Sequence, residues 1–247
     1  MSQTLDRALQ ILEYVGDKPR RIGEIAEFLG VHHSTALRFL HTLRKHGFVQ
    51  ELPGHSYRLG SAMFRLGFQS LEGIELRSLA RPAMERLNLL TGETVHLGSL
   101  EDGTVLYIEK VEASHPIRMH SRIGAVARLH CTGVAKGIVA FLPLTERDRL
   151  LAGYDMVRRT EHTLVEREAL EADFAASRER GYALDDEENE PGIHCVSAPV
   201  HSGEGVVIAA LSISAPVIRV DRDTLLSYAP ALIEAAHETS RQLGWRG

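Results

Sequence analysis

Two cysteines, each preceded by a histidine, are the side chains of this sequence best suited to nucleophilic or metal chemistry. They are His130-Cys131 and His194-Cys195. Neighbouring residues on a strand point to opposite faces, so neither pair can act on itself. The sequence has no CxxC and no HxxxH spacing, and a four-ligand zinc site would need both pairs to meet in space. We find no catalytic constellation and predict that the protein is not an enzyme, with no metal site and no cofactor.

Two other stretches approach a ligand-binding motif without the required spacing. Asp185-Asp-Glu-Glu188 is acidic like a calcium loop, but its ligands do not alternate, so we expect a solvated turn. Thr132-Gly-Val-Ala-Lys136 is not a phosphate-binding loop, which requires Gly-x4-Gly-Lys. The chemistry of this chain is therefore expected to be binding, not catalysis.

A helix-turn-helix and a hairpin are predicted between Arg21 and Leu59. Runs 22–29 and 34–43 carry apolar residues at helical spacing, and Gly30 between them can adopt the positive φ of a tight turn. Ser34 and Thr35 are expected to cap the second helix. Strands 48–52 and 56–59 flank Pro53-Gly54, which completes a winged helix-turn-helix. The residues expected to face the core are Leu5, Ala8, Leu9, Leu12 and Val15 of a preceding helix, with Ile22, Ile25, Ala26, Leu29, Ala36, Leu37, Leu40 and Leu43 of the motif.

The second helix of such a motif enters the DNA major groove with its N-terminal half. Arg38 can bind guanine through two hydrogen bonds, and Arg58 on the wing suits a phosphate. A three-helix module that binds protein is the alternative. The predicted DNA-contacting residues are His33, Ser34, Thr35, Arg38, Thr42 and Arg58.

Composition is that of a globular chain of 247 residues, 44% hydrophobic and 25% charged. No apolar run approaches the roughly 18 residues of a membrane span, and the start has no signal-peptide pattern. Two cysteines make no disulfide framework, so a cytoplasmic location is predicted. The net charge is −5, yet residues 1–60 hold 8 Lys and Arg against 6 Asp and Glu. Residues 1–60 are thus only weakly basic, so we expect one copy of this DNA-binding domain to bind DNA with modest affinity and to need dimerisation.

The remaining pattern predicts an α+β fold with an antiparallel sheet, because hairpin-type strands alternate with helices. Ser61–Leu71 is expected to be a linker helix, packed either on a partner chain or on its own wing. The expected domains are 1–60, a linker at 61–73 and a second domain at 74–247. Further helices are expected at 4–15, 76–90, 132–142, 146–151, 166–181 and 221–243, and strands at 94–100, 105–111, 182–185, 195–201 and 206–214, with Ile117-Arg-Met119 as a candidate strand.

Many short motifs in a fixed order resemble the IclR family of bacterial transcriptional regulators over residues 4–245. Among them are Arg7-Ala-Leu-Gln-Ile-Leu12, Tyr57-Arg-Leu-Gly60, Pro191-Gly-Ile-His-Cys195 and Leu211-Ser-Ile-Ser214. The resemblance implies an N-terminal winged helix-turn-helix, a linker helix and a C-terminal GAF/PAS-like antiparallel sheet flanked by helices. It is strongest to repressors of sugar-acid catabolism, which sense acids of the 2-keto-3-deoxygluconate type.

The same resemblance implies an effector site in the second domain. Gly133 and Val134 open a helix, whose free N–H groups can bind a carboxylate. Ser212 and Ser214 share one face of a strand at a spacing of two, although such a pair can equally be a solvated face. The implied effector-binding residues are Met119, Gly133, Val134, Asp185, Ile193, Cys195, Ser212 and Ser214, with Met119 and Ile193 as apolar walls.

These features predict a ligand-responsive DNA-binding regulator, a repressor of a catabolic operon that senses a small carboxylate-bearing metabolite such as a 2-keto or sugar acid. Its partners are expected to be double-stranded operator DNA, that metabolite and a second copy of the chain, as a homodimer or dimer of dimers, with no membrane. The alternative is a cytosolic metabolite-binding or hydrolytic protein whose winged helix is a protein-interaction module.

Overall fold

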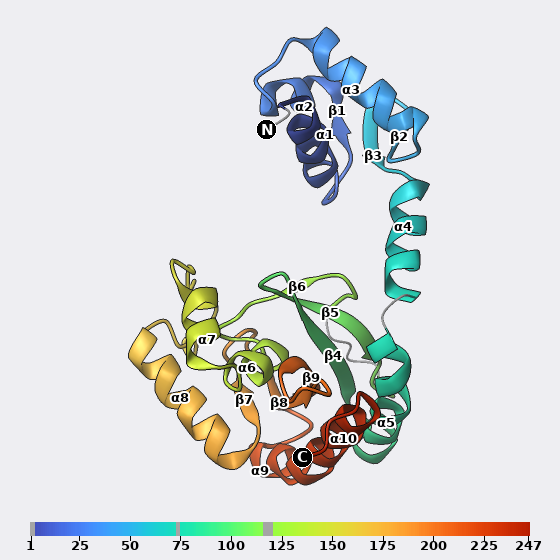
Figure 1. The fold of residues 1–247 in the computed structure, drawn as a ribbon. Coiled ribbons are helices and arrows are strands. Elements are labelled where there is room, and N and C mark those ends of the chain that lie inside the picture. Colours follow the sequence, from blue (N-terminus) through green and yellow to red (C-terminus); the bar gives the residue numbers. More distant parts are fainter. Residues whose placement is uncertain (1–2, 73–74, 116–120) are drawn as a thin grey trace. The chain divides into compact units, whose positions relative to one another are not determined.

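The computed structural model of the protein describes residues 3–72, 75–115 and 121–247. The chain divides into two compact units, a first unit Met1–Ile74 and a second unit Glu75–Gly247 (Figure 1). No helix in the described part of the chain is long and apolar enough to cross a membrane.

The first unit has the predicted winged helix-turn-helix, with one additional strand. Strand β1 pairs antiparallel with β3, so that the sheet order is β1-β3-β2. With only two residues, β1 is too short for any periodicity in the sequence to reveal it. The elements are α1 (Gln3–Tyr14), β1 (Arg20–Arg21), α2 (Ile22–Phe28), α3 (His33–Lys45), β2 (Val49–Leu52), β3 (Ser56–Leu59) and α4 (Ser61–Glu72).

The core of the first unit differs from the expected set at three leucines. Leu5 is 61% exposed, Leu9 52% and Leu37 49%, so these predictions of core positions were wrong. Helix α1 turns Ile11 inward instead, and Val15, just after its end, is buried as expected. Because a short helix with a wide apolar face can pack in more than one orientation, its sequence does not decide which apolar residues are buried. Packing against the neighbouring helices decides it.

The ends of the two motif helices also depart from the predicted caps. Helix α3 begins at His33 with His32 as its N-cap, so Ser34 and Thr35 lie inside the first turn and do not cap it. The turn before it contains Gly30 at φ +61°, as expected. At the start of α2, the Arg21 N–H donates to Glu24 Oε2 over 2.7 Å, which satisfies one backbone donor without a Ser or Thr cap.

The second unit is built on a six-stranded antiparallel sheet in the order β6-β5-β4-β9-β8-β7. Asp102 and Gly103 both have positive φ in the β4–β5 turn, as the Asp-Gly pair predicted. Strand β6 was not predicted, and the candidate strand at 117–119 lies outside the described residues. The strands are β4 (Thr94–Glu101), β5 (Thr104–Val111), β6 (Val126–Ala127), β7 (Ala183–Asp186), β8 (Ile193–His201) and β9 (Val207–Pro216).

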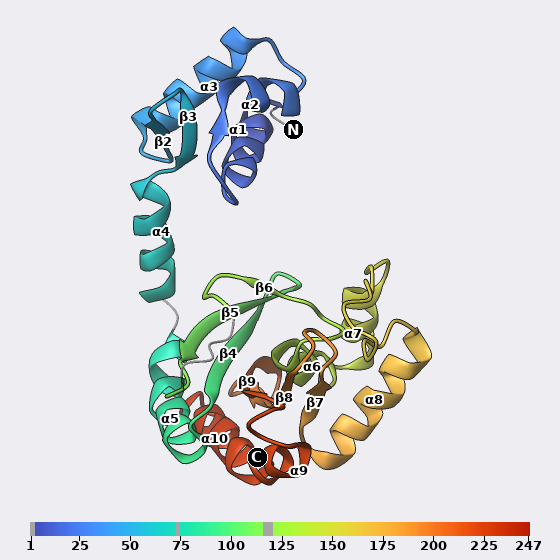
Figure 2. The ribbon, with the colours of Figure 1, turned by 180° about the vertical axis from the view of Figure 1, so that it is seen from behind.

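Helices cover both faces of this sheet (Figures 1 and 2). Helices α5 (Glu75–Thr91) and α10 (Ala229–Gln242) lie side by side on one face of the sheet. Helix α6 (Gly133–Val139) lies on the other face, inside the concave side of the curled sheet. Helices α7 (Leu144–Leu151) and α8 (Arg167–Arg180) follow on the α6 side. The single helix expected at 221–243 is two, α9 (Arg222–Ser227) and α10, because Pro230 has no N–H to continue the first.

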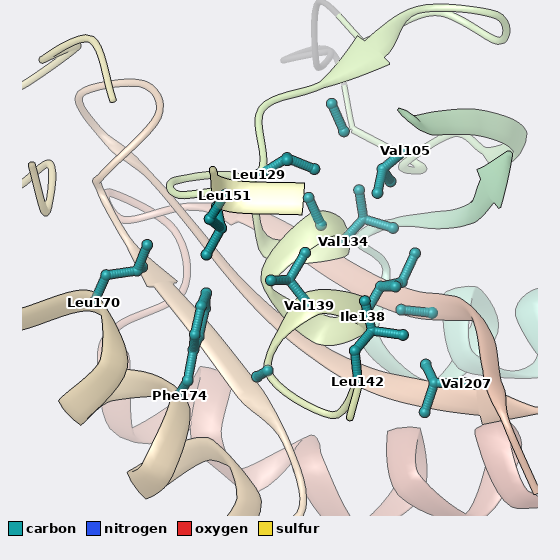
Figure 3. Close-up of a cluster of buried hydrophobic side chains, with 14 residues drawn as sticks. Val105, Leu129, Val134, Ile138, Val139, Leu142, Leu151, Leu170, Phe174 and Val207 are labelled. Carbon is teal, nitrogen blue, oxygen red and sulfur yellow. The ribbon is translucent and has the colours of Figure 1, made fainter. Parts of the chain in front are cut away.

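Every residue of α6 is buried, which makes this helix the centre of the second unit's core. Val139 lies toward Leu170 and Phe174 of α8, and Ile138 lies toward Val207 of β9 (Figure 3). The helix is thereby fixed against both α8 and the sheet, so its N-terminal end has a defined position relative to the strands.

Candidate effector cavity and DNA-reading face

A cavity of about 420 Å³ lies where the start of α6 meets strands β7, β8 and β9. This volume is within the range of roughly 300–1,000 Å³ common for small-molecule sites. Met119 lies outside the described residues, while the other seven predicted effector residues all line the cavity: Gly133, Val134, Asp185, Ile193, Cys195, Ser212 and Ser214.

Glycines allow α6 to approach the sheet closely enough to form this cavity. A Cβ at Gly133 would lie 2.6 Å from Cys195 Cβ and 3.1 Å from Ser212 Oγ. A Cβ at Gly98 of β4 would lie 2.5 Å from Val134 Cγ2. The Ser197 hydroxyl donates to the Gly133 carbonyl over 2.6 Å, which holds the first residue of the helix on β8. A larger residue at either position would push the helix off the sheet.

The two serines of β9 face the cavity and not solvent. Ser212 is 1% exposed and Ser214 4%, so the alternative of a solvated face was wrong. Ser214 Oγ lies 3.3 Å from His96 Nδ1, and His96 Nε2 lies 2.7 Å from Ser121 Oγ. Within the described part of the chain, Ser212 Oγ is buried with no hydrogen-bond partner. Of these two serine hydroxyls, Ser214 is thus engaged and Ser212 is available.

Burial shifts the pKa values of the titratable groups around these serines toward their neutral forms. Burial, with the nearby Lys110 ammonium, lowers the pKa of His96 to about 3. Burial raises the pKa of Asp185 to about 6, against the opposing effects of Lys136 and the N–H groups of Glu188 and Asn189. Burial beside Asp185 also raises the pKa of Cys195 well above the usual range for a thiol. A neutral thiol is a weak nucleophile, so this cavity is suited to binding by hydrogen bonds.

Behind the cavity, the acidic run 185–188 is anchored by a buried lysine. Lys136 of α6 is fully buried and forms ion pairs with Glu188, over 2.5 Å, and with Asp173 of α8, over 3.0 Å. Asp185 is 2% and Glu188 6% exposed, so the expectation of a solvated turn was wrong. Asp185 accepts the N–H of Glu188 over 2.8 Å, which orients the turn beside the cavity.

Several polar residues of the cavity were not predicted. Arg128 and Arg159 belong to irregular segments, whereas His96 and Tyr107 are spread along neighbouring strands. No local spacing connects these positions, although the register that places His96 opposite Ser212 could have been derived once β4 and β9 were known to pair. The residues missed by the sequence analysis include His96, Tyr107, Ser121, Arg128, Thr132, Arg159 and Asn189.

The predicted DNA-contacting residues lie on the open surface of α3 and the wing. His33, Ser34, Arg38 and Thr42 are exposed, and Thr35 is half-buried. Arg58 is exposed on β3, where its guanidinium donates to Gln50 Oε1 of β2 over 3.0 and 3.2 Å. Leu37, expected in the core, belongs to the same exposed face.

The wing also carries a more open hollow of about 890 Å³. Its charged lining residues already pair with one another, Arg44 and His55 both with Glu51. Because those charges are satisfied and solvent-exposed, we assign no small-molecule site there. Among the residues that the structure describes, no three His, Cys, Asp or Glu side chains group as metal ligands.

A winged helix-turn-helix joined to a domain with a ligand-sized cavity defines the class of ligand-responsive DNA-binding regulators. The model of the IclR helix-turn-helix domain matches residues 4–53, and that of the bacterial transcriptional regulator IclR C-terminal domain matches residues 68–241. The chain therefore belongs to the IclR family of transcriptional regulators.

Individual relatives agree over almost the whole chain. The transcriptional regulator XynR of Escherichia coli K12 is 39% identical over 98% of both chains. KdgR of the same organism is 37% identical, over 95% of this chain and 90% of its own. The crystal structure of Thermotoga maritima IclR has a TM-score of 0.79 at 32% identity, covering 99% of this chain and 100% of that one.

These relatives confirm the predicted fold class and the predicted function as a DNA-binding regulator with an effector-binding C-terminal domain. They are named as transcriptional regulators, which are not enzymes. The alternative of a metabolite-binding or hydrolytic protein with an interaction module is not favoured.

Proposed function

We propose that this regulator represses a catabolic operon and responds to a small polar organic acid, such as a 2-keto or sugar acid, bound in the cavity of the second unit. The observation that carries the proposal is the buried Ser212 hydroxyl, which faces the cavity without a partner among the described residues. An unsatisfied buried hydroxyl costs about 1–3 kcal/mol, so a ligand oxygen placed there is favoured.

The composition of the cavity supports an acid. Arg128 and Arg159 bring two cations to a lining that also has hydroxyls, a thiol, the His96 imidazole, the Asn189 amide, apolar walls and two carboxyl groups, Asp185 and Glu190. A family member from Microbacterium hydrocarbonoxydans, 25% identical with a TM-score of 0.81, was crystallised with 4-hydroxybenzoate, which is also a carboxylate. KdgR and the IclR repressor are regulators in the same family.

Each predicted residue has a role in this proposal. Ser212 and Ser214 orient ligand oxygens, and Asp185 with Cys195 selects a ligand hydroxyl over a second anion, because a bare carboxylate facing a ligand carboxylate would repel it. Gly133 and Val134 form the wall at the start of α6. Ile193 is an apolar wall, and Met119 is proposed as another.

The effector proposal is tested by DNA binding with and without candidate acids. Keto acids, sugar acids and aromatic acids are added to a gel shift on the upstream DNA of the regulator's own operon. The wild type should change affinity for DNA by about 1–3 kcal/mol when the effector binds. Ser214→Ala and Asp185→Ala should still bind DNA but lose this response.

Ser227→Ala, an exposed hydroxyl on α9, is the matched control and should respond normally. Should Ser214→Ala and Asp185→Ala respond like the wild type, the effector site lies elsewhere.

On the DNA side, we propose that His33, Ser34, Thr35, Arg38, Thr42 and Arg58 contact the operator. The protein would act in the cytoplasm, where its operator lies, as a homodimer or dimer of dimers on a near-palindromic site. The modest positive charge of residues 1–60 supports this, because two linked DNA-binding domains double the phosphate contacts. A monomer in sedimentation at micromolar concentration, bound to an asymmetric site, would overturn the proposal.

The domain boundaries 1–60, 61–73 and 74–247 are part of the same proposal. Deleting residues 1–73 should leave a folded protein that binds the acid but not DNA. Loss of folding in that fragment would show that the boundary is misplaced.

A further inference from the structure

Arg159 stands out among the cavity residues because its charge is uncommitted. Arg159 is one of the residues that line the cavity, it is exposed, and no described residue hydrogen-bonds or ion-pairs with its guanidinium. Arg128, the other cavity cation, already donates from Nη1 to Asn189 Oδ1 over 3.1 Å. The Lys136 ammonium is enclosed behind the cavity by Glu188 and Asp173. Of the two arginines that line the cavity, Arg159 is therefore the one whose guanidinium makes no hydrogen bond to another described residue.

The backbone of Arg159 is held in place by a buried threonine. Thr163, 3% exposed, accepts the N–H of Arg159 over 3.0 Å and that of Thr160 over 2.8 Å. The Thr163 hydroxyl in turn donates to the Glu188 carbonyl over 2.7 Å. Thr160 donates to the Glu187 carbonyl, also over 2.7 Å. The segment carrying Arg159 is thus fastened to the acidic turn, whose neighbours Asp185, Asn189 and Glu190 line the cavity.

The start of α6 is a poorer place for the ligand's carboxylate than the sequence suggested. Helix α6 has seven residues, so its dipole is short. The Gly133 N–H already interacts with the Cys195 thiol, and Gly133 is packed against Cys195 and Ser212. Hydroxyl groups crowd that end of the cavity, whereas Arg159 offers a planar fork that matches a carboxylate through two parallel hydrogen bonds.

We propose that Arg159 is the residue that recognises the acid group of the effector, so that the ligand binds with its carboxylate at Arg159 and its oxygen-bearing carbons toward Ser212. This assignment rests on the proposed function, since it places the acid in the same cavity. It makes the segment 158–163 the part of the protein that distinguishes an acid from the corresponding neutral polyol.

Calorimetric titration of the full-length protein with 2-keto-D-gluconate, pyruvate and the neutral polyol D-glucitol tests the assignment. A charge-assisted hydrogen-bonded contact is worth about 1.5–3 kcal/mol, so Arg159→Gln should raise the Kd for the acids about 10- to 100-fold. D-glucitol should bind equally weakly to wild type and variant. Arg159→Lys, which keeps the charge but not the fork, should fall between the two.

Two further variants separate charge recognition from a general effect on the segment. Arg158→Gln removes the neighbouring cation, which does not line the cavity and donates to the carbonyls of Glu161 and Thr163. It should leave the Kd for the acids within about twofold of wild type. Thr163→Val removes the anchor and should weaken acid binding less than Arg159→Gln does. Added KCl screens the attraction between Arg159 and the carboxylate, so the Kd of the wild type for the acids should rise with KCl more steeply than that of Arg159→Gln.

The possible failures are distinguishable. Acid binding that is weakened by Ser212→Ala but unchanged by Arg159→Gln would overturn this inference, place the carboxylate at the start of α6 and leave the proposed function intact. If the wild type binds none of the acids, or if Ser212→Ala has no effect on their binding, the proposed function itself fails. An equal loss in Arg158→Gln and Arg159→Gln would reduce Arg159 to a structural role.

Discussion

The two units of this regulator place their functional polar groups in opposite environments. In the first unit, Arg38 and Thr42 stand on an open helix face, where their exposure makes them available to DNA. In the second unit, Ser212, Asp185 and Lys136 are buried and depend on neighbours contributed by distant strands and helices. Substitutions on the DNA-reading face should therefore change binding with little effect on folding, whereas substitutions around the cavity should affect both.

The largest expected effect comes from removing the buried lysine. Lys136→Met removes the cation from the buried Glu188 and leaves Asp173 with Arg180 alone, and it should lower the free energy of unfolding of the second unit by about 3–5 kcal/mol. Circular dichroism during urea unfolding follows both units, and the fluorescence of the single tryptophan, Trp245, reports on the second unit. Lys45→Met, on the exposed surface of α3, is the control and should change stability by less than about 0.5 kcal/mol. Equal stability of the two variants would contradict the contrast between the units.

A smaller effect is expected from the pH dependence of the same cluster. Burial raises the pKa of Glu188 from 4.5 to about 7, so the folded protein retains a proton that the unfolded chain releases. The stability contributed by this group is complete below pH 4.5 and is lost as pH rises through about 7. The difference in Tm between wild type and Glu188→Gln should follow this course and then level off. A constant difference from pH 4 to 8 would show that folding does not shift the pKa of Glu188.

On the DNA-reading face, the contrast predicts a loss of specificity without a loss of stability. Arg38→Ala should weaken binding to the operator by about 1–3 kcal/mol, because a base contact is lost, and leave Tm unchanged. Arg58→Ala should weaken operator and random DNA about equally, because phosphates carry no sequence information. Fluorescence anisotropy on both DNAs measures the ratio. An unaltered ratio in Arg38→Ala would mean that α3 is not oriented as proposed.

The smallest expected effect is a change in Tm when the residue that caps a helix is replaced. Asp221 caps α9 by accepting the Thr224 N–H over 2.8 Å, so Asp221→Ala should lower Tm by a few degrees. Ser34 lies inside the first turn of α3, so Ser34→Ala should leave Tm unchanged while weakening DNA binding. Thermal denaturation measures both, and a matching loss in Ser34→Ala would restore it as a stabilising residue.

Local patterns in the sequence account for most of the fold, including the wing turn and the Asp102-Gly103 hairpin. They failed where orientation depends on a partner: Leu5, Leu9 and Leu37 satisfy helical periodicity yet face outward. The break near Tyr228 was missed because the apolar spacing continues across it, although Pro230 was visible.

The cavity residues were predictable only where they are neighbours on one strand. Ser212 and Ser214 could be placed on one face of a strand from their spacing alone. His96 and Arg159 could not be connected to them, because they come from a strand and a loop that meet β9 only through the sheet order and the Thr163 anchor. The burial of Glu188 likewise depends on Lys136, 52 positions earlier in the chain.

The central position of β9 also has a consequence for how the protein is made. Its neighbour β4 begins at Thr94, and β9 itself ends at Pro216, so the sheet cannot close until nearly the whole chain has been synthesised. The first unit contains only contacts among residues that emerge early, and such local contacts form quickly. We therefore expect a nascent chain to acquire its DNA-contacting surface well before the strands that sense the metabolite have assembled.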